Sequence, residues 1–89
     1  MRLINNYIPP GAGKLMLLKE QLNYSGKQMA ELAGVANNNQ WRKYTGGEEP
    51  RTMNPHMLFF IAAQLSLSQD EIRKVLQKMH DIGADFDDP

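Results

Sequence analysis

Amide and cationic side chains are concentrated in one short stretch near the middle of this 89-residue chain. The candidate base-contacting residues in this stretch are Asn38, Asn39, Arg42 and Lys43. Asparagine can form two hydrogen bonds to adenine, and arginine or lysine can form two to guanine, so the set suits the edges of DNA bases. An asparagine run can also serve only to cap a helix, and adjacent cations are often a solvated surface pair. The surrounding elements must decide between these alternatives.

The stretch is predicted to form a short helix over about residues 37–45, which a pair of glycines ends. Trp41 and Tyr44 lie three residues apart, and we expect both rings to face the core. At about 100° per residue, the opposite side of this helix is predicted to carry Asn39, Arg42 and Lys43. Asn38 falls on the flank near the helix start, and Asn37 is better placed to cap the helix than to contact a base.

A second short helix is predicted directly before this stretch. Ser25 and Gln28 have the spacing of a capping box, which favours a helix that begins right after Ser25. Gly34 is expected to end this helix in a left-handed conformation. Two short helices that cross closely need a small residue inside the first helix and a glycine in the turn. Ala30 and Gly34, four residues apart, satisfy this need, and Val35 can fill the crossing.

The segments YSGKQMAELAGV and WRKYTGGEEP, followed by a capped apolar helix, resemble the Cro/phage-repressor (XRE-type) helix-turn-helix DNA-binding family over about residues 14–76. The resemblance implies an all-α, five-helix, lambda-repressor-like domain in which the second and third helices form the helix-turn-helix and the third enters the major groove. The family often opens its second helix with a glutamine that contacts phosphate. Gly26 occupies that position here, with Ser25 and Lys27 as substitutes. Counted from Gly34, the aromatic pair comes one residue late, so we infer one extra residue in the turn, within VANNN.

Residues at the edges of the same surface are candidates for contacts to the DNA backbone. The predicted phosphate-contacting residues are Ser25, Lys27, Arg51 and Thr52. The chain as a whole has ten basic and ten acidic residues, whereas DNA-binding domains often carry excess positive charge. Residues 1–60 nevertheless have a net charge of +3 and residues 61–89 a net charge of −3, which permits a cationic face on the N-terminal part. This distribution is also compatible with ordinary scatter of surface charge.

The remaining segments complete a single helix-turn-helix domain over residues 1–89. Residues 1–11 are predicted to be an irregular N-terminal arm, because Pro9 and Pro10 cannot lie inside a helix. Residues 12–22 are predicted to form the first helix, with leucines at i, i+3 and i+7 and a stop at Asn23. Residues 84–89 are expected to be a frayed acidic tail.

Two further helices are predicted in the C-terminal part. Asn54 and Pro55 form a cap and first-turn pair for a strongly apolar helix over residues 55–65, which we expect to be central to the core. Ser68 and Glu71 have the capping-box spacing and start the last helix. The apolar stripe of the last helix comprises Ile72, Val75, Leu76, Met79 and Ile82. This stripe can close the core, or it can pair with a second copy, which would let a homodimer address two half-sites.

Other chemistries find little support in the sequence. The segment PPGAGK resembles the end of a phosphate-binding loop, but Leu15 stands where a hydroxyl residue is needed. His56 and His80 have no partner at ligand spacing, and cysteine is absent, so no metal site and no cofactor are expected. The adjacent carboxylates Glu48 and Glu49 lack a base or nucleophile, so no enzymatic activity is expected. No apolar run is long enough for a membrane span, so we expect a cytoplasmic protein.

The sequence therefore predicts a sequence-specific DNA-binding transcriptional regulator that binds double-stranded DNA as a homodimer. Its family resemblance suggests a phage or mobile-element origin. The alternative is a protein–protein interaction module that has the same fold and does not bind DNA. The neutral net charge and the acidic C-terminal part motivate this alternative.

Overall fold

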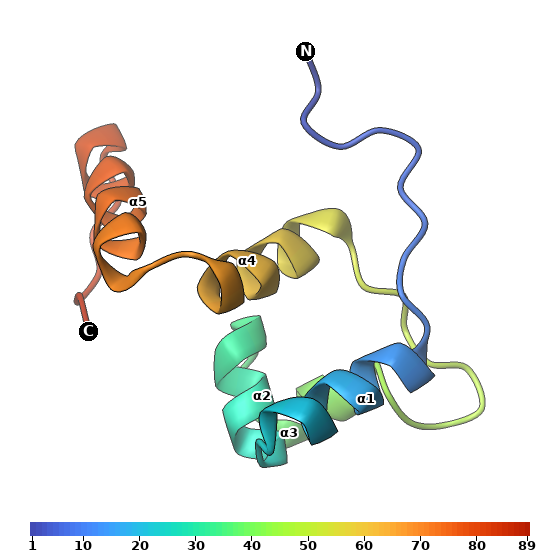
Figure 1. Cartoon of the computed structure of the whole chain (residues 1–89). Helices are drawn as coiled ribbons and strands as arrows, with labels where there is room; N and C mark the ends of the chain where they lie inside the picture. Colours follow the sequence, from blue (N-terminus) through green and yellow to red (C-terminus); the bar gives the residue numbers. More distant parts are fainter.

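The computed structural model describes residues 1–89 and contains five helices and no strand (Figure 1). The helices are α1 (Ala12–Leu22), α2 (Gly26–Ala33), α3 (Asn38–Arg42), α4 (Pro55–Ser66) and α5 (Gln69–Ile82). The all-α class predicted from the sequence is confirmed. No helix combines the length and the apolar character that crossing a membrane requires.

Local capping chemistry sets most helix boundaries, as predicted. Ser25 accepts a hydrogen bond from the backbone N–H of Gln28, and the Gln28 side chain accepts one from the Ser25 N–H. Ser68 and Glu71 form the same reciprocal pair at the start of α5. These bonds satisfy backbone donors that have no partner inside the helix. Left-handed residues end three of the helices, namely Asn23 after α1, Gly34 after α2 and Gly83 after α5.

Helix α2 lies at the centre of the core. It contributes four of the nine buried side chains, Met29, Ala30, Leu32 and Ala33, and it packs against both α3 and α4. The most completely enclosed residues besides Met29 are Trp41, Met53 and Ile61. The core therefore joins α2 to α3, to the loop after α3 and to α4, with Leu15 contributed by α1.

Helix α4 is less buried than the sequence analysis expected. Ile61 is its only buried residue, while Phe59 and Phe60 are about half exposed. The expectation that this helix is central to the core is wrong in this respect. The helix is apolar on nearly every side, but only one side of it meets α2, so the remaining apolar surface has no covering element.

Helix α5 stands apart from the other helices. It joins α4 through Leu67, whose backbone is extended, and Figure 1 shows it beyond the far end of α4, away from α3. None of its residues is buried. Of the two roles considered for its apolar stripe, closure of the core is therefore not observed within the chain.

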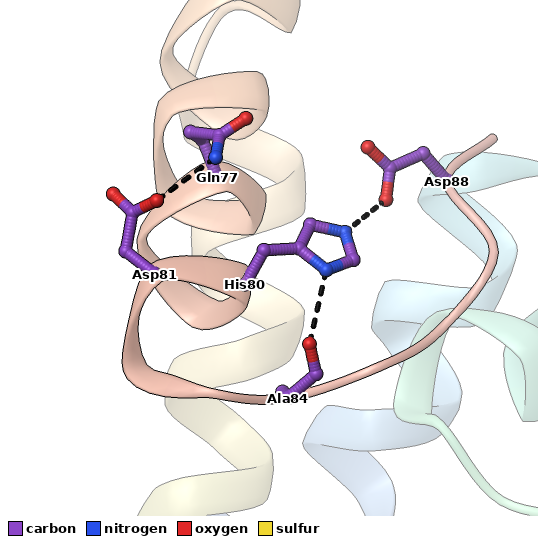
Figure 2. Close-up of polar contacts among 5 residues, drawn as sticks. All are labelled: Gln77, His80, Asp81, Ala84 and Asp88. Carbon is purple, nitrogen blue, oxygen red and sulfur yellow. Dashed lines mark hydrogen bonds and ion pairs between the residues drawn. The ribbon is translucent and has the colours of Figure 1, made fainter.

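The C-terminal tail folds back on α5 and does not fray (Figure 2). The His80 ring lies 3.0 Å from the Ala84 carbonyl oxygen through Nδ1 and 2.7 Å from the Asp88 carboxylate through Nε2. Phe86 stacks on the same ring with 4.0 Å between the ring centroids. Both polar partners are acceptors, so both bonds form together only when the ring carries a proton on each nitrogen, and the bonds to Asp88 and Ala84 raise the pKa of His80. The fraying expected for residues 84–89 is thus not observed.

The N-terminal arm is irregular, as predicted, but it is fastened at one point. The Tyr7 hydroxyl donates a 2.8 Å hydrogen bond to the carbonyl oxygen of Met53. Its partial burial there raises the pKa of Tyr7. The arm therefore meets the chain at the loop that leads from α3 to α4.

Candidate nucleic-acid interface

The turn between α2 and α3 comprises residues 34–37 and brings the two helices into contact. Gly34 has φ +74°, and the N–H of Val35 donates to the Ala30 carbonyl at 3.0 Å. The Val35 side chain packs against the core, as expected for a residue that fills the crossing. A Cβ at Gly34 would lie 3.2 Å from Cε2 of Phe60, so the turn also fits closely against α4.

The inner side of α3 is aromatic, as the sequence analysis predicted. Trp41 is 1% exposed and Tyr44 is 7% exposed. Both belong to the same cluster of buried residues as Met29 of α2. The rotation of α3 about its axis is therefore fixed by two large rings in the core.

The helix itself is shorter than the predicted span of residues 37–45. Asn37 is the N-cap, and its side chain accepts a 3.1 Å hydrogen bond from the N–H of Gln40. After Arg42 the chain continues in turns, with a 3.0 Å bond from the Tyr44 N–H to the Trp41 carbonyl and a 2.8 Å bond from the Gly46 N–H to the Arg42 carbonyl.

The outer side of α3 and the residue that caps its C-terminal end carry three of the predicted base-contacting residues. Asn39, Arg42 and Lys43 are all exposed. None of their side chains takes part in a hydrogen bond or an ion pair within the chain. Their amide and cationic groups are therefore free for an external partner.

Asn38, the fourth predicted base-contacting residue, is placed differently. Its carboxamide lies directly against Gly26, the first residue of α2, in space that a Cβ at Gly26 would occupy. The residue as a whole is nevertheless exposed. The sequence analysis did not foresee this contact, and the only signal for it was a glycine at the first position of a capped helix.

Arg51 is the predicted phosphate-contacting residue that is most closely tied to α3. Its N–H donates to the Lys43 carbonyl at 2.7 Å, and its guanidinium carbon lies 6.0 Å from the centroid of the Tyr44 ring. A guanidinium in this position is attracted to the face of the ring. Thr52 follows it in the loop and is also exposed.

Ser25 and Lys27, the other two predicted phosphate-contacting residues, lie at the start of α2. The Ser25 hydroxyl oxygen accepts a bond from the Gln28 N–H, which leaves its own O–H available as a donor. Lys27 occupies the first turn of α2 and is exposed. The start of a helix and a nearby lysine both favour an anionic partner.

Comparisons of the chain with protein-family models, with curated proteins and with solved structures found no match. The candidate interface is therefore defined by geometry alone. It consists of the outer side of α3, the first turn of α2 and the part of the loop between α3 and α4 that contains Arg51 and Thr52.

Proposed function

We propose that this chain is a sequence-specific regulator of transcription that binds double-stranded DNA through α3. The observation that supports the proposal most directly is the division of α3 into two sides. Trp41 and Tyr44 are enclosed, while Asn39, Arg42 and Lys43 are exposed and unpaired. A short helix with this division can present amide and cationic groups to the base edges of a major groove.

In this proposal α2 and α3 form the helix-turn-helix of a lambda-repressor-like, XRE-type domain, whose core in this chain is built from α1 to α4. Arg42 and Lys43 contact guanines and Asn39 contacts an adenine, while Lys27 and Arg51 bind the phosphates on either side. Binding to a promoter would change the access of RNA polymerase. Two copies, placed about 34 Å apart along the duplex, would read two half-sites and double the phosphate contacts of a neutral chain.

The test combines selection of bound fragments from random duplex DNA with the Arg42→Ala substitution. If Arg42 forms a bidentate contact to guanine, its loss should weaken binding to the selected site by about 1–3 kcal/mol and relax the preference at one base position. Fluorescence anisotropy of labelled selected and random duplexes would measure this difference. An equal loss on both duplexes would contradict a base-reading role for Arg42.

A protein–protein interaction module is the second candidate function. The exposed apolar surface of α4 and α5 is the observation that favours it. A module of this kind would give no anisotropy change with any duplex even at low salt, where every DNA-binding protein binds most strongly. The same titration therefore separates the two functions.

A further inference from the structure

An apolar ridge runs along α5 without any covering element. Val75, Met79 and Ile82 are 48%, 43% and 78% exposed, and their spacing of four and three residues places them on one side of the helix. The remaining members of the stripe, Ile72 and Leu76, are only partly buried. We call Val75, Met79 and Ile82 the α5 ridge. A helix with a continuous apolar side is expected to bury that side against something.

The total surface of the chain indicates how much is uncovered. The accessible surface is 7067 Å². A compact monomer of 10.1 kDa exposes about 5,300 Å², so the excess is about 1,800 Å². The Cα radius of gyration of 14.3 Å likewise exceeds the value of about 12 Å for a compact chain of this length.

We propose that the α5 ridge is the contact surface of a symmetric homodimer, in which the α5 helices of two copies pack antiparallel. The excess surface belongs to the whole chain: besides the α5 ridge it includes exposed apolar residues of the N-terminal arm, such as Leu3 and Ile8, and of α4, such as Phe59. A second copy offers an identical apolar ridge to the one that the chain itself leaves uncovered.

The charges that flank the ridge favour the antiparallel orientation. Glu71 and Lys78 lie on the same flank of α5, because seven residues correspond to about two helical turns. A two-fold axis near Val75 places Glu71 of one copy within about one turn of the partner's Lys78, and the same pair recurs by symmetry. Lys78 forms no ion pair within its own chain, so its charge is available for this contact.

Sedimentation equilibrium of the full chain without DNA tests the interface. The wild-type chain should show twice the monomer mass of 10.1 kDa at micromolar concentration. Met79→Lys should raise the dimer dissociation constant by about tenfold or more, because each subunit would have to bury an unpaired ammonium group. Met16→Lys is the matched control, because Met16 is 51% exposed on α1, and it should leave the dissociation constant unchanged.

Charge reversal tests the orientation. Lys78→Glu and Glu71→Lys should each weaken their own homodimers, because like charges would then meet at both symmetric contacts. An equimolar mixture of the two variants should recover the dimer, because every contact then joins opposite charges. Loss of a cap bond at Glu71 cannot produce this recovery.

Two results would overturn the proposal. One is a wild-type chain that stays monomeric at a concentration 100-fold above the micromolar range and has a radius of gyration near 12 Å by small-angle scattering. That radius would mean that α5 folds against its own chain. The other is a dimer that Met79→Lys does not weaken. Self-association is measured without DNA, so its failure is distinct from failure of the proposed function.

Discussion

Lys27 offers a sharp test of the proposed DNA complex, because its side chain has no structural role within the chain. It lies in the first turn of α2, is exposed and forms no ion pair. Replacement with glutamine keeps a similar length and helix propensity and removes only the charge. The substitution Lys27→Gln should therefore change the electrostatic part of DNA binding without changing the fold.

The magnitude follows from the number of phosphates that the proposed complex neutralises. Lys27 and Arg51 of two copies would neutralise four, which gives a slope of about −3.6 in a plot of log affinity against log salt concentration, or a loss of about 150-fold between 50 and 200 mM salt. Lys27→Gln leaves two such contacts, a slope of about −1.8 and a loss of about 12-fold. Charges on α3 would steepen the plots of the wild-type chain and of Lys27→Gln equally. The difference of about 1.8 between the two slopes is therefore the quantity that tests the role of Lys27.

Fluorescence anisotropy with a labelled duplex at four salt concentrations measures both slopes. Lys74→Gln is the control, because it removes one exposed charge from α5, away from α3 (Figure 1). The control should leave the slope as it is in the wild-type chain. A change in slope below about 0.5 for Lys27→Gln, or an equal change for the control, would refute the placement of α2 against the DNA backbone.

Two further predictions concern the fold. Gly34→Ala should lower the free energy of unfolding by about 1–2 kcal/mol, because φ is +74° and the new Cβ would meet Phe60. The free energy of unfolding is measured by urea titration. Gly47→Ala is the control, because Gly47 has φ +80° and open space around it, so its loss of stability reports the backbone strain alone. An equal loss of stability in the two variants would exclude a contribution from Phe60. The raised pKa of His80 means that the contribution of the charged ring to tail attachment is fully present below about pH 6.5 and is lost as the pH rises through that raised pKa. Asp88→Asn should lower the pKa of His80 in an NMR titration, and an unchanged value would contradict the role of Asp88.

The helix boundaries could be predicted from the sequence because their causes are local. A capping box needs only two residues at a spacing of three, and both Ser25–Gln28 and Ser68–Glu71 form one. The inward direction of Trp41 could be predicted for a similar reason, since two aromatic residues three positions apart define one side of a helix. The division of this segment into an enclosed and an open side therefore followed from residues within α3 and the turn directly after it.

The parts that could not be predicted depend on contacts between distant segments. The early end of α3 coincides with a bond from the Arg51 N–H to the Lys43 carbonyl, and nothing near Lys43 indicates that bond. The contact between Asn38 and Gly26 likewise joins two helices. Periodicity showed that α4 and α5 are apolar, but it gives no information on which surface, if any, covers an apolar side.

The short length of α3 has a consequence for the proposed interface. A five-residue helix is not stable by itself, so its position depends on Trp41 in the core and on the loop that returns through Arg51. Arg51 would thus act both as a phosphate contact and as a support for Tyr44, and its substitution would combine a lost charge with a displaced helix. Lys27 lacks this second role, which is why its salt dependence reports on phosphate binding alone. The packing of Trp41 in the core therefore sets the orientation of the proposed base-contacting residues. A substitution that loosens this packing should weaken binding to all duplexes and not only to a preferred site.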